Sequence, residues 1–220
     1  VEHYGLDIER AVFCAGSDRF RYAKALGAHL FLSANGKDVA AAVQNGVAAA
    51  TMLPAETDGA AGEATIRVAF DGDSVLFSSE ADDCYRDKGL EAFRRIESEK
   101  ANVPLGEGPF RPFLEALRKL QQQFPAGECP VRIGMVTARG VPSHGRPLQT
   151  LRHWGVQVDE AIFAGGMPKG PLLKAFRADI FFDDTSKNVE SAREHDIPSG
   201  HVPYGSGQGI VAPTQSFAAA

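Results

Sequence analysis

The sequence of 220 residues has no excess of positive charge, no long apolar segment and few cysteines. Its 23 Lys and Arg against 28 Asp and Glu give a formal net charge of −5, which argues against binding to a nucleic-acid polymer. No apolar run reaches the about 18 residues that a membrane-spanning helix needs. The three cysteines are odd in number and widely spaced, which favours a reduced cytoplasmic interior over a disulfide framework or a zinc site. We therefore expect a cytoplasmic globular protein with a small-molecule partner.

The first residues, V-E-H-Y-G, lack both an initiator methionine and the basic-then-apolar pattern of a signal peptide. The sequence also carries an internal repeat, in which residues 1–50 align with residues 151–200 at a constant offset and without a gap. If the duplication included the segment that precedes the second copy, about 80 or more residues would be missing upstream of Val1. We therefore expect the chain to be part of a longer protein and less stable than the full product.

The two copies of the repeat share identical residues along their whole length, among them His3/His153, Gly16/Gly166, Phe31/Phe181 and Val39/Val189. Each copy follows the pattern strand, helix, strand, helix. They differ at Asp183 and Asp184, which correspond to Ser33 and Ala34 in the first copy. We interpret residues 1–50 as a degenerate structural copy without the acidic pair.

Alternating strands and helices predict an α/β, Rossmann-like fold with a mostly parallel sheet and flanking helices. We expect strands at 65–70, 131–136, 161–164 and 180–182, and helices at 83–100, 111–123, 169–176 and 188–195. The helices at 83–100 and 111–123 form a block that we interpret as a small helical cap insertion. The predicted domains are a degenerate repeat copy at 1–55, a catalytic core at 62–203 with its cap at about 78–128, and a mobile tail at 204–220.

Polar residues follow three of the expected strands. They are Asp71 and Asp73 after the first, Thr137 and Arg139 after the second, and Asp183 and Asp184 after the last. A single acidic residue in such a place is ordinarily a helix cap or a turn former. Ligands of open α/β sheets, however, bind beyond the carboxyl ends of the strands, where these side chains would meet. Four carboxylates at one edge repel one another unless a cation lies among them, and oxygen ligands of this kind suit Mg²⁺.

The order of these motifs, with Lys169 between Thr137 and the acidic pair, resembles the haloacid dehalogenase superfamily. Longer segments resemble the cytosolic type I 5′-nucleotidase family over nearly all of residues 1–203. They are V-A-F-D-G-D-S-V-L-F-S at 68–78, P-L-G-E-G-P-F-R-P-F-L-E-A-L at 104–117 and F-F-D-D-T-S-K-N-V at 181–189. The resemblance implies a Mg²⁺-dependent hydrolase that converts nucleoside 5′-monophosphates to nucleoside and phosphate.

The resemblance also implies roles for individual residues. Asp71 would attack the phosphorus and form an aspartyl-phosphate, and Asp73 would protonate the leaving oxygen and then activate water. Thr137 and Lys169 would bind the phosphoryl oxygens. Arg139 would either contact the substrate or cap the following helix.

The metal ligands implied by the resemblance are Asp71, Asp183, Asp184 and the backbone carbonyl of Asp73. Within the helical block, five aromatic and basic residues are candidates for contact with base or ribose: Tyr85, Phe93, Arg94, Phe110 and Arg111. They could equally pack the core of the cap itself.

Other functions remain open at this point. A phosphatase acting on sugars or other small molecules would use the same motifs, because cap residues choose the leaving group. An inactive nucleotide-binding module is a further alternative, although the complete set of motifs argues against it. A receiver domain places its acidic pair before the phosphorylated Asp, whereas Asp183 and Asp184 come last. Association into a homo-oligomer is also left open.

Overall fold

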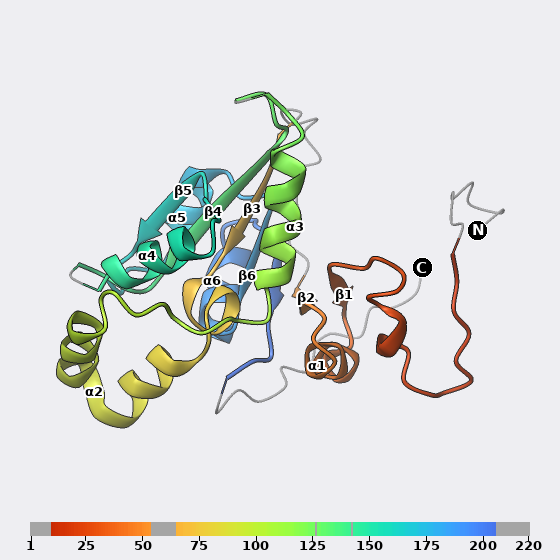
Figure 1. Cartoon of the computed structure of the whole chain (residues 1–220), viewed down its shortest axis with the longest axis horizontal. Coiled ribbons are helices and arrows are strands. Elements are labelled where there is room, and N and C mark those ends of the chain that lie inside the picture. Colours follow the sequence, from red (N-terminus) through yellow and green to blue (C-terminus); the bar gives the residue numbers. More distant parts are fainter. Residues whose placement is uncertain (1–9, 54–64, 126, 142, 206–220) are drawn as a thin grey trace.

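The computed structural model describes residues 10–53, 65–125, 127–141 and 143–205 (Figure 1). In these residues seven strands form one sheet, in the order β1-β2-β7-β6-β3-β4-β5. The strands are β1 (Phe31–Ser33), β2 (Ala49–Leu53), β3 (Ile66–Phe70), β4 (Val131–Thr137), β5 (Glu160–Phe163), β6 (Ile180–Asp183) and β7 (Ser199–His201). Neighbouring strands are parallel except β2 and β7, which are antiparallel. The predicted α/β fold with a mostly parallel sheet is confirmed.

Six α-helices connect or flank these strands in the part of the chain that the structure describes. They are α1 (Gly36–Gln44), α2 (Glu80–Glu99), α3 (Arg111–Gln121), α4 (Gly145–His153), α5 (Lys169–Phe176) and α6 (Ser186–Arg193). None of the helices in the described ranges is both long enough and apolar enough to cross a membrane.

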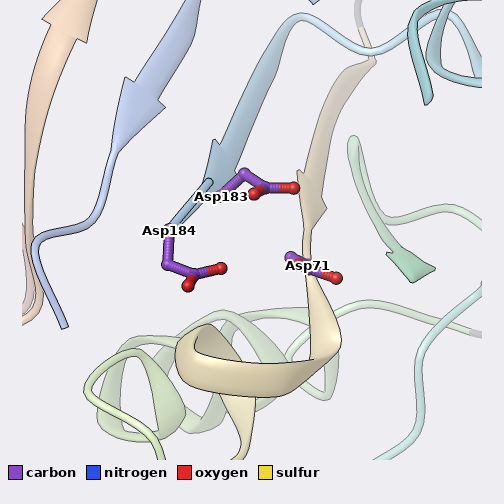
Figure 2. Close-up of side chains that lie close together, drawn as sticks. All are labelled: Asp71, Asp183 and Asp184. Atoms are coloured by element: carbon purple, nitrogen blue, oxygen red, sulfur yellow. The ribbon is translucent and has the colours of Figure 1, made fainter. Parts of the chain in front are cut away.

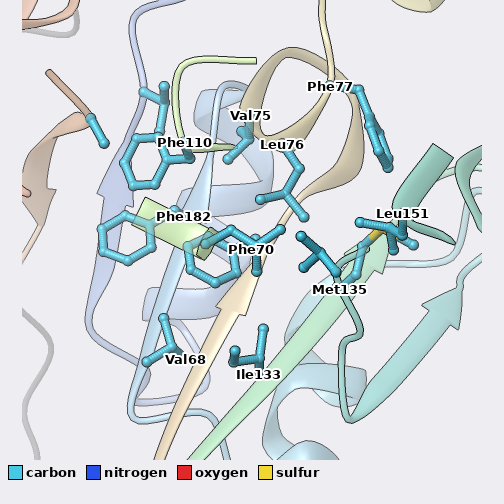
Figure 3. Close-up of a cluster of buried hydrophobic side chains, with 14 of the residues drawn as sticks. Val68, Phe70, Val75, Leu76, Phe77, Phe110, Ile133, Met135, Leu151 and Phe182 are labelled. Carbon is cyan, nitrogen blue, oxygen red and sulfur yellow. The ribbon is translucent and has the colours of Figure 1, made fainter. Parts of the chain in front are cut away.

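The two faces of the sheet carry separate hydrophobic clusters, because side chains alternate along each strand. Val68 and Phe70 of β3 belong to the larger cluster, together with Leu114 of α3 and Leu151 of α4 (Figure 3). Ala69, between them, belongs to the other cluster, with residues of α5 and α6. Helices α3 and α4 therefore cover one face of the sheet, and α5 and α6 cover the other.

The internal repeat is visible in the strand pairing. In the first copy Phe31 pairs with Ala49 and Ser33 with Thr51. In the second copy Phe181 pairs with Ser199 and Asp183 with His201, so equivalent residues have the same register.

The antiparallel contact between β2 and β7 joins the two copies. Thr51 pairs with His201, its own equivalent, and Leu53 pairs with Ser199. The pairing is therefore symmetrical about Thr51 and His201, and the strand pairs β1-β2 and β7-β6 are related by a local twofold axis at that point. The predicted units 1–55 and 62–203 consequently share one continuous sheet.

The two helices of the expected cap have different surroundings. Phe110 and Leu114, at the start of α3, are fully buried in the larger core cluster, so α3 is a layer of the core. Helix α2 has few buried residues, and it bends at Gly89, where φ is 77°. We therefore confine the proposed cap to α2. The predicted mobile tail lies outside the described residues from position 206 onward.

Candidate active site

Two neighbouring parallel strands bring three carboxyl groups together. Asp71 directly follows β3 and Asp183 ends β6, and the backbone N–H of Asp71 donates to the Phe182 carbonyl at 2.8 Å. Asp184 comes next in the chain. Figure 2 shows the side chains of Asp183 and Asp184 extending toward Asp71, and one oxygen from each of the three lies within 4.8 Å of the others. All three residues are buried.

Lys169 is the cation of this group, and it is the first residue of α5. Its Nζ lies 2.7 Å from Asp71 Oδ1 and 2.7 Å from Asp183 Oδ2, and its side chain is 1% exposed. Burial alone would lower the pKa of Lys169, but the charges of Asp183 and Asp71 outweigh this effect and raise it. The lysine is therefore held in its charged form between the two carboxylates.

One ammonium does not balance three buried carboxylates. Burial raises the pKa of Asp71 well above its ordinary value; Lys169 opposes this shift, while Asp183 and Asp184 add to it. Burial and the charge of Asp183 raise the pKa of Asp184 to about 8. A donor set of carboxylate oxygens with surplus negative charge fits a hard divalent cation, whose charge would offset the repulsion. Asp71, Asp183 and Asp184 are the residues that could hold it.

Two groups that sequence reasoning missed orient Asp183. The backbone N–H of Thr185 donates to Asp183 Oδ1 at 2.8 Å, and Asn188 Nδ2 donates to Oδ1 and Oδ2 at 3.2 and 3.1 Å. Asn188 lies on α6, in the first turn after the acidic pair. The short spacing within the segment F-F-D-D-T-S-K-N could have identified it, because a side chain in that turn can reach back to the end of the strand.

The turn after Asp71 sends the next carboxyl group in another direction. Residues Gly72–Leu76 form a wide turn in which Ser74 has a φ of 60°. Asp73 extends from this turn toward Arg139, whose Nε and Nη2 donate to its two oxygens at 2.6 and 2.8 Å. The side chain of Asp73 therefore does not belong to the carboxylate group around Lys169. The backbone carbonyl of Asp73 stays a candidate metal ligand, whereas its side chain does not.

Thr137 lies at the end of β4, beside the same turn. It is 1% exposed, and its Oγ1 accepts the backbone N–H of Arg139 at 3.2 Å. A Cβ atom at Gly72 would lie 3.4 Å from both Cβ and Oγ1 of Thr137. The turn that carries Asp71 and Asp73 thus passes close to the Thr137 hydroxyl.

A pocket of about 540 Å³ opens beside Asp73, between α2 and the loops that follow β4 and β5. Tyr85, Phe93 and Arg94 of α2 line one side of it. The rings of Tyr85 and Phe93 form an edge-to-face pair with centroids 6.2 Å apart. Asp82 is also in the wall, and burial together with the charge of Asp73 raises its pKa to about 6.

The other two residues expected to contact the base or ribose lie elsewhere. Phe110 is fully buried and packs against Phe70 and Phe182, so it is a core residue. The Arg111 guanidinium lies over the ring of Trp154, 4.7 Å from the centroid, and pairs with Glu107 and Glu115. Neither Phe110 nor Arg111 lines this pocket, because the start of α3 is attached to the core.

Comparisons with known proteins bear on this site. A family model described as 5′-nucleotidase matches residues 1–209. Human cytosolic 5′-nucleotidase 1B is 42% identical over 198 residues, which cover 88% of this chain and 32% of the relative. The chain thus spans about a third of the length of that relative.

Two solved structures overlap with part of the chain. The HAD domain of the effector protein Lem4 from Legionella pneumophila has a TM-score of 0.38 and 12% identity, covering 63% of this chain and 88% of that one. A HAD-superfamily hydrolase of subfamily IA from Geobacter sulfurreducens has a TM-score of 0.33 and 16% identity, covering 64% and 88%. Both structural similarities are distant, so the α/β fold class follows from the strand order and the mostly parallel pairing of the sheet. The matched residues 1–209 and the identity to the human protein show that the chain belongs to the 5′-nucleotidase family.

Proposed function

We propose that this chain hydrolyses nucleoside 5′-monophosphates to nucleoside and phosphate, with Mg²⁺ as the metal and Asp71 as the nucleophile. The observation that carries the proposal is the juxtaposition of the carboxylate group around Lys169 with a pocket that begins at Asp73. The first can receive a phosphoryl group, and the second has room for the rest of a nucleotide.

In the first step an oxygen of Asp71 attacks phosphorus, and the bond to the 5′-oxygen of the nucleoside breaks. Oδ1 of Asp71 accepts hydrogen bonds from Gly72 N and Lys169 Nζ at 2.6 and 2.7 Å, so Oδ2 is the proposed attacking atom. Lys169 and the Thr137 hydroxyl would stabilise the charge that develops on the phosphoryl oxygens. Asp73 would give a proton to the leaving 5′-oxygen.

In the second step Asp73 would take a proton from water, which then hydrolyses the aspartyl-phosphate and restores Asp71. Asp183 and Asp184, with the backbone carbonyl of Asp73, complete the proposed set of ligands around Asp71. When bound, the cation would supply positive charge that allows a carboxylate to approach a phosphate dianion.

The aromatic rings of Tyr85 and Phe93 and the guanidinium of Arg94 would bind the nucleoside part. A planar base stacks favourably on aromatic side chains, and a cation in the wall can pair with polar groups of base or ribose. The human relative is named as a cytosolic 5′-nucleotidase, and this supports both the substrate class and the predicted cytoplasmic location.

The test is a panel of nucleoside monophosphates, sugar phosphates and 4-nitrophenyl phosphate, with phosphate release measured with Mg²⁺ and with a chelator. We expect the nucleotides to be the best substrates and the chelator to stop turnover. Asp71→Asn should abolish turnover in a folded protein, because an amide cannot form the aspartyl-phosphate. Equal turnover of sugar phosphates would remove the nucleotide assignment, and activity in the chelator would remove the metal.

A further inference from the structure

A series of five charged side chains of alternating sign runs from the turn after β3 to α2 and α4. Its members are Asp73, Arg139, Glu97, Arg146 and Glu80. Arg139 also donates from Nη1 to Glu97 Oε2, and Arg146 donates to Glu97 Oε1 at 2.8 Å. Arg146 reaches Glu80 Oε1 at 2.6 Å as well. The side chains of Arg139, Glu97 and Arg146 are each 3% exposed, so the middle of the series lies in the interior, whereas Glu80 at its end is 38% exposed.

Arg139 determines where the carboxyl group of Asp73 lies. Its Nε and Nη2 each donate to a different oxygen of Asp73, which fixes both the position and the plane of the carboxyl group. A group that transfers a proton to a leaving oxygen must be held within hydrogen-bond reach of that oxygen. The guanidinium is therefore in a position to control proton transfer through the carboxyl group that it holds.

Glu97 in turn holds Arg139, and it lies on α2, the helix whose Phe93 and Arg94 line the pocket. The bend at Gly89 divides α2, and the part after the bend carries Phe93 and Arg94, which line the pocket, and then Glu97. The Arg139 guanidinium also lies 5.4 Å from the centroid of the Phe93 ring. A displacement of this part of α2 would move Glu97, and with it the partner of Asp73.

We propose that Arg139 is a positioning residue for Asp73, and that Glu97 couples the pocket-lining part of α2 to it. This proposal rests on the proposed function in one respect, the role of Asp73 as the proton donor. It differs from both roles that the sequence left open for Arg139, contact with substrate or a cap for the following helix, because Nε and Nη2 donate to Asp73 and Nη1 donates to Glu97.

The experiment compares two leaving groups in the intact chain. A nucleoside 5′-monophosphate leaves as an alkoxide and needs a proton, whereas the nitrophenolate of 4-nitrophenyl phosphate leaves without one. Arg139→Gln should lower kcat for the nucleotide by about 100-fold and kcat for the aryl ester by less than about 10-fold, with little change in either KM. Arg139→Lys keeps the charge but not the paired hydrogen bonds. The fall in kcat for the nucleotide, relative to that for the aryl ester, should therefore be smaller than in Arg139→Gln. Glu97→Gln should show the same selectivity as Arg139→Gln, to a lesser degree.

Arg146→Gln is the matched control, because Arg146 is equally buried and shares Glu97 but does not touch Asp73. It should lower both rates by the same factor. Equal losses for both leaving groups in Arg139→Gln and Arg139→Lys would overturn the proposal, and so would a rise in KM with kcat unchanged. Asp73→Asn serves as the reference for loss of the proton donor. A wild-type chain that cleaves glycerol 2-phosphate but no nucleotide would remove the proposed substrate instead, and the comparison would then use that alkyl ester.

Discussion

Asp184 is a buried acid that lies close to two other carboxylates, Asp71 and Asp183. It is 5% exposed, it follows Asp183 directly, and its pKa is raised to about 8. Without a cation, Asp184 must either be charged beside Asp183 or take up a proton on folding, and both cost free energy of folding.

Asp184→Asn should accordingly make the metal-free protein more stable at pH 7, by about 1 kcal/mol or more, because it removes an acid that must otherwise be protonated or buried as a like charge on folding. The same substitution should reduce the stabilisation that Mg²⁺ gives, since a ligand is lost. Thermal unfolding with a chelator and over a series of Mg²⁺ concentrations measures both effects. A variant that is less stable than wild type in the chelator would contradict the explanation by repulsion.

Spacing along the chain is sufficient to identify some residues of the site but not others. Asp71, Thr137, Lys169 and Asp183 each follow a strand or begin a helix, and parallel strands must bring such positions to one edge. Glu97 and Arg146 have no such signal. A glutamate in the charged helix α2 ordinarily faces solvent, and only the packing of α2 against α4 and the loop after β4 buries it. The direction of the Asp73 side chain depends on that same packing.

At the scale of elements, the end of α3 and the starts of β4 and β5 are joined by Asp159. Its Oδ2 accepts from the backbone N–H of Ile133 and from Gln121 Nε2, both at 2.8 Å, and its Oδ1 accepts from Arg132 at 3.0 Å. Burial would raise the pKa of Asp159, but these hydrogen bonds outweigh it and lower the pKa. An acid with a lowered pKa stabilises the fold above its unfolded pKa, and this contribution is lost as the pH falls through the folded value.

Asp159→Asn should therefore reduce the free energy of unfolding by about 1 kcal/mol at pH 7, and by less near pH 3. Urea unfolding at the two pH values measures the difference. Asp87→Asn is a suitable control, because that side chain is 60% exposed and should change stability little at either pH. An equal loss for Asp159→Asn at both pH values would show that the charge of Asp159 is not involved.

The bounds of helices with a strong local sequence pattern can be predicted almost to the residue. The surface against which α3 packs cannot be predicted in this way. Helix α5 occupies the predicted residues 169–176, since a short apolar face follows Pro168 and ends at Arg177, which has a φ of 60°. Helix α3 was expected in the cap because it follows α2 in the same helical block. Its amphipathic pattern indicates one buried face but not the surface against which that face packs, and here this is the sheet.

For the molecule as a whole, the two repeat copies differ in how many strands and how many large apolar side chains they pack against. β6 pairs with both β3 and β7, whereas β1 pairs only with β2 among the strands in the described residues. The cluster under α1 consists mainly of small residues, Phe20, Ala23, Val39, Ala42, Val47 and Ala49. Local opening has a lower cost where fewer large apolar groups are buried.

Backbone amides of β1 and α1 should therefore exchange with solvent faster than those of β6 and α6, by about tenfold or more. The repeat supplies its own control, because residues 31–44 and 181–194 have the same arrangement of strand and helix. Hydrogen exchange followed by mass spectrometry compares the two segments in one sample. Equal protection of both segments would indicate that the whole sheet opens as a single unit.

The twofold relation at Thr51 and His201 also divides the surface of the molecule. Because β2 runs opposite to β7, strands β1 and β2 end at the rim of the sheet opposite to the one where β3, β4 and β6 end. Ser33, the counterpart of Asp183, thus lies on the far rim from the carboxylates. The duplicated half adds two strands to the sheet, but only one copy contributes side chains to the rim with the carboxylates. Each rim can therefore change its side chains in evolution without altering the chemistry at the other.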